Sequence, residues 1–401
     1  MDASTDRSLR LLTLCQGLLL TQSAMLTSVN GLAGLLLAPD PRLATLPVTV
    51  YVLGGALATL PISLAMQRHG RRYGFALGCA AALLGALVAA SGIAYGSFLA
   101  LCAGTLLCGV YNASGQYFRF AVFDLAPPER RARALGLVLS GGLLGAVLGP
   151  FLSRHTIAAL DTRFLGTYLV LLLLASAVFG LTRLLALPAP EPVVAMPAGG
   201  GARFGPLARR PGFWLALLAS AAAWASMNLL MTATPLAMQL CGYPFADAAF
   251  ALQWHMVGMY APMLVAGRLL ARFGERRMIA GGALIVMLCN AVAWHGESVA
   301  HFELALALLG VGWALLFSGG TALLVQQHGP ADKGLAQGVH DTVMFGAMTV
   351  SSLMAGVMVA RASWAWLQGV AFALMLLVLA GLALLNARAP DARRAPEPVP
   401  D

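Results

Sequence analysis

Residues 164–187 read FLGTYLVLLLLASAVFGLTRLLAL, and Arg183 is their only charged residue. A helix needs about 20 apolar residues to cross the hydrocarbon core of a bilayer, so this stretch is long enough to span a membrane. The chain holds twelve such stretches and is therefore expected to be an all-α polytopic membrane protein. The predicted spans are residues 9–37, 46–66, 73–95, 97–118, 134–153 and 164–187, followed by 212–240, 246–270, 278–295, 301–325, 335–360 and 364–386.

The composition of the whole chain also indicates a membrane protein. Its 401 residues are 59% hydrophobic and 10% charged, whereas a soluble domain carries about 25% charged residues. The formal net charge is +9, but the basic residues lie in short gaps between apolar runs, which is typical of membrane topology rather than nucleic-acid binding. The six cysteines form no CxxC pair, so no disulfide framework or zinc site is predicted.

Enzyme signatures are absent from the sequence. It contains no GxxxxGK[ST] phosphate loop, no GxSxG nucleophile elbow and no HExxH motif. We therefore predict no catalytic residue and no permanently bound cofactor.

A polar segment divides the chain near its midpoint. Residues 188–211, PAPEPVVAMPAGGGARFGPLARRP, are rich in Pro, Gly and Ala and lack apolar periodicity, as expected of a flexible linker. We predict an N-terminal six-helix bundle over 1–187, a cytoplasmic linker over 188–211, a C-terminal six-helix bundle over 212–386 and a disordered cytoplasmic tail over 387–401.

The distribution of Lys and Arg predicts the orientation. When the twelve spans are threaded through a bilayer, 21 of the 25 basic residues fall on one side. The four on the other side are Arg42, Arg154, Arg163 and Arg361. Because cytoplasmic loops carry the excess of basic residues, both termini are predicted to be cytoplasmic.

Short motifs recur in the two halves and resemble those of a known family. Gly70-Arg71-Arg72 follows the second span, and a related RFGERR motif around Gly274 follows the eighth. This loop resembles the signature of the major facilitator superfamily, although Gln67 stands where that family has an acid. Two further matches are the helix-four pair Arg119 and Asp124, and the helix-five glycine face of Gly141, Gly145, Gly149 and Pro150. The resemblance implies two pseudo-symmetric six-helix bundles around a central cavity, and alternating access.

The seventh and eighth spans carry a constellation of metal-ligating residue types. Met227 and Met231 are spaced i, i+4, and so are His255 and Met259, so each pair lies on one helical face. At a rise of about 1.5 Å per residue, Met231 and His255 lie roughly 13 Å from the outer ends of their helices, and Met227 and Met259 roughly 20 Å. Three thioethers and one imidazole are therefore expected at matching depths. Soft sulfur and imidazole ligands suit copper.

The same two segments resemble the CcoA-like copper importers, a bacterial branch of the superfamily. The matching stretches are MNLLMTATPLAM and QWHMVGMYAP. The resemblance implies that Met227, Met231, His255 and Met259 bind copper as the transported substrate. It also implies import for cytochrome oxidase assembly, release to cytoplasmic copper carriers, and a monomer in the lipid bilayer.

Two alternatives to copper import remain open at this stage. In the first, the methionines only pack helix interfaces, and Trp224, Trp254 and Tyr260 stack a small organic solute such as riboflavin; the same branch is expected to include riboflavin-type transporters. In the second, the protein is a copper sensor or assembly scaffold that moves no substrate. The two-fold repeat argues against that class.

Other polar residues in the spans each have two interpretations. His340 and Asp341 either couple proton movement or lie in the cytoplasmic interface. A second group either lines a polar cavity or bonds neighbouring helices. It comprises Asn30, Tyr51, Asn112, Gln116, Asn228 and Trp254. On the outer side, Cys241 and the group His295, Glu297, His301 and Glu303 either capture a metal or form an ordinary solvated loop, which is the interpretation we favour.

Overall fold

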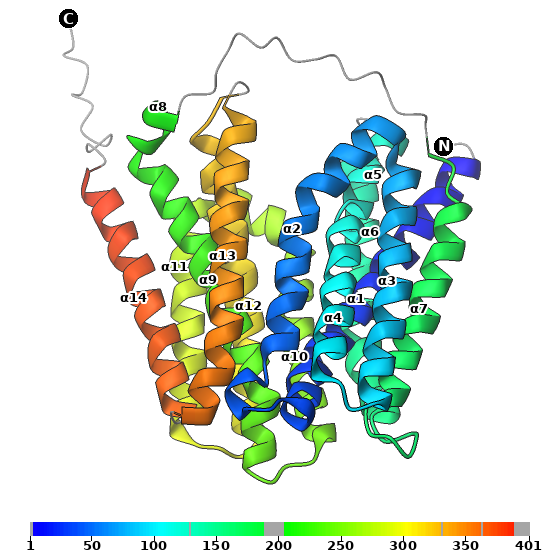
Figure 1. Cartoon of the computed structure of the whole chain (residues 1–401). Helices are drawn as coiled ribbons and strands as arrows, with labels where there is room; N and C mark the ends of the chain where they lie inside the picture. Colours follow the sequence, from blue (N-terminus) through cyan, green and yellow to red (C-terminus); the bar gives the residue numbers. More distant parts are fainter. Residues whose placement is uncertain (1–2, 128–129, 188–203, 330–331, 362–363, 389–401) are drawn as a thin grey trace, which may run out of the picture.

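The computed structural model describes residues 3–127, 130–187, 204–329, 332–361 and 364–388. Within these ranges every regular element is a helix (Figure 1). In the N-terminal half these are α1 (Ala3–Leu37), η1 (Pro41–Leu43), α2 (Leu46–His69), α3 (Arg71–Ala94), α4 (Phe98–Gly115), α5 (Phe118–Leu125), α6 (Arg131–Thr156) and α7 (Leu165–Arg183). They continue as α8 (Phe204–Ala208), α9 (Pro211–Leu240), α10 (Phe245–Met263), α11 (Ala266–His295), α12 (Val299–Gln326), α13 (Lys333–Arg361) and α14 (Trp364–Arg388).

The helices form two groups that stand side by side. Helices α1 to α7 pack on one another, and so do α9 to α14 (Figure 1). The start of α1 and the end of α14 lie at one end of the molecule, here called the terminal face, and η1 lies at the opposite end, the η1 face. The predicted linker and tail fall mainly on 188–203 and 389–401, which are outside the described residues.

The structure confirms most of the predicted spans. Among the described residues, eleven helical spans are long and apolar enough to cross a membrane. Helix α10 is not among them, because its 19 residues include Asp247, Gln253 and His255. The predicted span 246–270 is also too long, since α10 ends at Met263 beside Pro262 and the chain then continues into α11.

Two further boundaries differ from the sequence prediction. The fourth span is not one helix, because the chain breaks at Gln116 and Tyr117 before α5 begins. The predicted span 134–153 is short at its end, because α6 continues to Thr156 with Pro150 inside it. By contrast, the repeated loop glycines adopt matching conformations, with φ of 87° at Gly70 and 75° at Gly274. Because side chains rarely adopt such left-handed angles, both halves need glycine at this turn.

The glycine face of α6 lets α1 approach closely. A Cβ atom at Gly145 would lie 2.6 Å from Cβ of Leu20. At Gly141 and Gly149 it would collide with Thr13 and Ala24 of the same helix. Small residues at one spacing therefore set the distance between these helices.

The hydrogen bonds that join the two halves lie at the η1 face. Thr49 of α2 shares a hydrogen bond of 3.2 Å with Ser352 of α13. The backbone N–H of Gly356 donates to Thr45 Oγ1 at 3.2 Å. Among the described residues these two bonds are the only ones between the halves. The ribbons of the halves diverge toward the terminal face (Figure 1), so this conformation is closed at the η1 face.

Candidate functional site

The four predicted metal ligands are all buried in helices α9 and α10. Met227, Met231, His255 and Met259 are each at most 6% exposed. His255 Nδ1 lies 3.0 Å from the carbonyl oxygen of Leu306 on α12, and since a carbonyl only accepts, Nδ1 carries the proton. The other ring nitrogen, Nε2, is sealed from solvent and has no hydrogen-bond partner among the described residues. It presents a free lone pair inside the bundle.

The three methionines belong to two hydrophobic clusters that share Tyr260 as a packing neighbour. Met227 and Met259 belong to one core cluster of the C-terminal half. Met231 belongs to another, together with Met256 and with Ala24 and Ala146 of the N-terminal half. This division follows from helix packing, because α10 lies mainly against α12 and α6 and makes fewer contacts with α9. The convergence of Met227, Met231, His255 and Met259 on one point stays a prediction.

An aromatic group that the sequence analysis only partly anticipated lies between α9 and α12. The ring of Trp224 stands edge-on to Trp313, with centroids 5.0 Å apart, and to Phe317, at 5.7 Å. Trp313 and Phe317 stack at 5.2 Å with an interplanar angle of 14°. The indole nitrogens of both tryptophans are sealed and lack hydrogen-bond partners in the described parts of the chain. We call Trp224, Trp313 and Phe317 the aromatic trio.

The trio contains one of the three residues predicted to stack an organic solute. Tyr260 packs on the same core cluster as Trp224. Trp254 does not join them, since it is 47% exposed and stands edge-on to Phe250 on α10. The sequence signal that was missed is the i, i+4 spacing of Trp313 and Phe317, which places both rings on one face of α12.

The predicted cavity asparagines all bond to neighbouring side chains or backbone. Asn30 accepts a hydrogen bond of 2.7 Å from the Tyr168 hydroxyl. Asn112 accepts one of 3.4 Å from the Gln116 amide within its own helix segment. Asn228 donates to the Met348 carbonyl oxygen at 2.8 Å and to Ser351 at 3.3 Å, and so ties α9 to α13. Tyr51 donates to Ser23 at 3.1 Å. These contacts fit the bonding interpretation.

The charged motif residues form separate contacts near the terminal face. Arg71 makes a two-point ion pair with Asp124, including a bond of 3.2 Å from Nη2 to Oδ1, and Arg72 donates to the Arg183 carbonyl oxygen at 2.8 Å. Arg119, the predicted motif companion of Asp124, does not pair with it. Its guanidinium lies 4.9 Å from the centre of the Phe120 ring.

The predicted proton-coupling residues are in contact with each other on α13. His340 Nδ1 lies 3.0 Å from Asp341 Oδ1. The imidazole is almost fully buried, whereas the carboxylate side chain is 54% exposed. Such a pair has the geometry to exchange a proton with water.

The outer polar residues do not form a metal cluster. Within the described ranges no group of three His, Cys, Asp or Glu side chains has metal-binding geometry. Cys241 Sγ lies 3.7 Å from Glu297 Oε2, and His301 contacts Ser298 at 2.6 Å. Partial burial, together with the Glu297 carboxylate, raises the pKa of the Cys241 thiol. The thiolate that a soft metal needs is therefore disfavoured.

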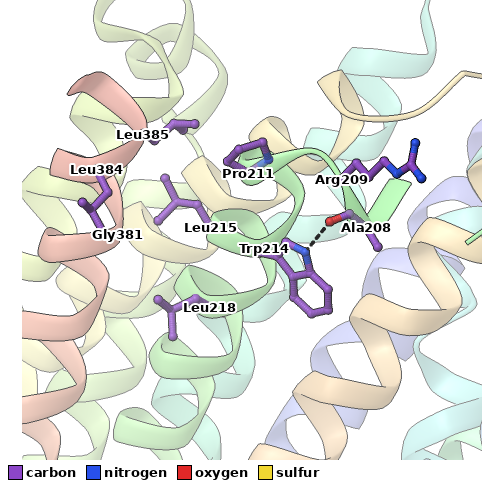
Figure 2. Close-up of a pocket in the computed structure, with 9 residues that line it drawn as sticks. All are labelled: Ala208, Arg209, Pro211, Trp214, Leu215, Leu218, Gly381, Leu384 and Leu385. Atoms are coloured by element: carbon purple, nitrogen blue, oxygen red, sulfur yellow. Dashed lines mark hydrogen bonds between the residues drawn. The ribbon is translucent and has the colours of Figure 1, made fainter. Parts of the chain in front are cut away.

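A surface groove of about 370 Å³ lies at the terminal face between α8, α9 and α14 (Figure 2). Leu215 and Leu218 face Gly381 and Leu384 across it, and the Trp214 indole donates to the Ala208 carbonyl oxygen at 2.7 Å. None of the predicted site residues lines this groove, so it is separate from the candidate site.

Comparison with known proteins gives consistent results along the whole chain. The profile of the Major Facilitator Superfamily matches residues 12–262 and 254–400. The chain is 37% identical over 389 residues to the riboflavin transporter RfnT of Brucella anthropi, which covers 94% of this chain and 95% of that protein. It is 30% identical to the MFS-type transporter YddS of Bacillus subtilis, over 82% of this chain and 80% of that protein.

Solved structures share the fold at low sequence identity. A POT family transporter in complex with 5-aminolevulinic acid superposes with a TM-score of 0.74 at 13% identity, covering 94% of this chain and 96% of that one. A D-xylose–proton symporter superposes with a TM-score of 0.70 at 16% identity, covering 93% and 96%. At these identities the similarity concerns the fold alone.

Proposed function

Because this chain belongs to the Major Facilitator Superfamily and is therefore a transporter rather than an enzyme, we propose that it carries riboflavin or a closely related flavin across the bacterial inner membrane. The observation that carries the proposal is the 37% identity to a riboflavin transporter along 94% of this chain. Copper import, which the sequence analysis placed first, receives no support from that relative. The order of the two hypotheses is therefore reversed.

The chemistry of the aromatic trio supports a flavin substrate. The trio offers aromatic ring surface at the centre of the C-terminal half, and Trp224 is only partly buried. A flavin ring is a flat heteroaromatic system that stacks on such surfaces. The two unpartnered indole N–H groups are donors, and buried donors are costly unless a ligand with acceptors reaches them.

Copper remains a second candidate because of one specific observation. His255 Nε2 is unprotonated, buried and without a hydrogen-bond partner in the described residues, and imidazole in this form is a ligand for copper. Met259 lies one turn away on the same helix. A sensor or scaffold that moves nothing is a weaker proposal for a member of a transporter family.

The proposed transport cycle uses the contacts between the halves. We place both termini in the cytoplasm from the distribution of basic residues, and the bundles at 1–187 and 212–386. The η1 face is then the outer face, and its hydrogen bonds close the outward path. Substrate would enter when these bonds break and leave from the conformation seen here. His340 and Asp341 are the residues proposed to couple this exchange to protons.

The proposal is tested by uptake in a riboflavin-requiring bacterial host without a flavin importer. Cells expressing the wild type should accumulate radiolabelled riboflavin. Trp224→Leu should reduce uptake at least tenfold, and Trp366→Leu, a change of an exposed tryptophan on α14, should not. No uptake by the wild type would refute the proposal. Copper accumulation measured in the same cells, with Met231→Ala and His255→Ala, tests the second candidate.

A further inference from the structure

Arg119 of α5 is an arginine without a hydrogen bond. Its Nε atom is sealed from solvent and unpartnered, and no other hydrogen bond reaches it from the described residues. The Arg119 guanidinium lies 4.9 Å from the centre of the Phe120 ring. The nearby carboxylate of Asp124 is already occupied by Arg71. A partly buried guanidinium without a bonded partner is costly.

Residues of the opposite half approach this arginine. Arg119 lies within electrostatic range of Tyr260 on α10 and of Asp341 on α13. The Tyr260 ring rests against Gly142 of α6, where an added Cβ would lie only 2.9 Å from its Cδ1 atom. Because Gly142 has no side chain, Tyr260 of the C-terminal half can pack against α6. Helix α6 contacts α5, which carries Arg119.

The polar tips of both side chains are available to a ligand. The Tyr260 hydroxyl and the terminal nitrogens of Arg119 have no hydrogen bond among the described residues. Both side chains are partly buried. Asp341, the nearby acid, is instead bonded to His340 and half exposed. The interface thus holds a charged donor and a hydroxyl donor that no protein acceptor satisfies.

The donor chemistry indicates which part of a flavin these residues would bind. A guanidinium group only donates hydrogen bonds and prefers planar, two-point acceptors. The pyrimidine edge of the flavin ring offers two carbonyl oxygens and an unprotonated ring nitrogen, whereas the ribityl hydroxyls are both donors and acceptors. We propose that Arg119 and Tyr260, one from each half, bind the carbonyl edge of the flavin ring. This assignment rests on the proposed function.

The test is a binding titration of the purified, full-length protein. Quenching of flavin fluorescence gives Kd for riboflavin and for lumiflavin, which keeps the ring and lacks the ribityl chain. Arg119→Gln should raise Kd for both by about tenfold to a hundredfold, as expected for loss of a charged hydrogen-bond donor. Tyr260→Phe should raise both about two- to tenfold.

Matched variants separate recognition from folding. Arg163→Gln is the control, because Arg163 also lies over a neighbouring ring, at 5.1 Å from the centre of Phe164, but on the η1 face; it should bind like the wild type. Arg119→Lys keeps the charge without the two-point geometry and should fall between the wild type and Arg119→Gln. If Arg119→Gln does not purify as a folded protein, Tyr260→Phe, which removes one oxygen atom, decides the question.

The outcomes distinguish this inference from the proposed function. If the wild type binds neither flavin, the proposed function fails and the assignment of Arg119 fails with it. If the wild type binds both flavins and the two variants bind them equally well, only the role of Arg119 and Tyr260 is refuted. Weaker binding of riboflavin with unchanged binding of lumiflavin would place the pair at the ribityl chain and overturn the carbonyl-edge assignment.

Discussion

The hydrogen bonds at the η1 face should control the balance between the two conformations of the transporter. Thr45, the N-cap of α2, and Thr49 of α2 are buried and bond to Gly356 and Ser352 of α13. Replacing both threonines with valine keeps the shape of the side chains and removes both bonds. A neutral hydrogen bond contributes about 1 kcal/mol net, so the double variant should lose about 2 kcal/mol. This corresponds to a shift of about thirtyfold toward the conformation open at the η1 face.

This shift can be measured as a distance distribution between two spin labels. Leu160, in the loop before α7, and Leu240, at the end of α9, are exposed and lie on the η1 face in different halves. Cysteines there, with the exposed Cys241 changed to serine, report the separation of the halves. The wild type should show mainly the shorter distance, and the double variant should gain a longer one.

A third substitution on the same helix provides the control. The Thr59 hydroxyl donates to the Gly55 carbonyl oxygen within α2 at 2.8 Å and does not reach the other half. Thr59→Val should therefore leave the distance distribution unchanged. The reasoning is refuted if the distribution of the double variant equals that of the wild type, or if Thr59→Val has the same effect.

Three further predictions concern helix packing at Gly145, the hydrogen bonds between α9 and α13, and the Cys241 thiol. Gly145→Val should destabilise the protein by about 1–3 kcal/mol in thermal unfolding, because its Cβ enters α1, whereas Gly180→Ala, which meets open space, should not. Asn228→Leu should cost about 1–3 kcal/mol, since it removes the two hydrogen bonds that join α9 to α13; an unchanged melting temperature would contradict this. Because the pKa of the Cys241 thiol is raised, less thiolate is present at pH 8, and its alkylation should be slower than that of a free cysteine. Glu297→Gln should lower that pKa and speed alkylation, and an equal rate would show that the carboxylate has no effect.

The sequence predicted the fold well because the signal is local. Twenty apolar residues between short basic gaps specify a spanning helix without knowledge of its neighbours. The prediction was less accurate where local signals compete. At α10, polar side chains and Pro262 shorten the helix, and at residues 116–117 the chain breaks although its apolar character continues to Val122.

The candidate site was harder to predict because it depends on contacts between helices. Periodicity correctly places Met227 with Met231, and His255 with Met259, on common faces. It does not show which helices α10 packs against, and in the structure these are mainly α12 and α6. Trp313 was missed for the same reason, since a tryptophan in an apolar helix can be assigned to a site only when its neighbours Trp224 and Phe317 are known.

The copper and flavin hypotheses require different arrangements of side chains in the helix bundle. A copper site needs several soft ligands within bonding distance of one point, and the convergence of Met227, Met231, His255 and Met259 on such a point stays a prediction. A flavin site needs extended ring surface and scattered donors, and it tolerates ligands spread over several helices. The unpartnered indole N–H groups, Arg119 and Tyr260 are spread in this way across α5, α9, α10 and α12. The spread of these donors is therefore compatible with the flavin proposal, which rests on the relative that covers 94% of this chain.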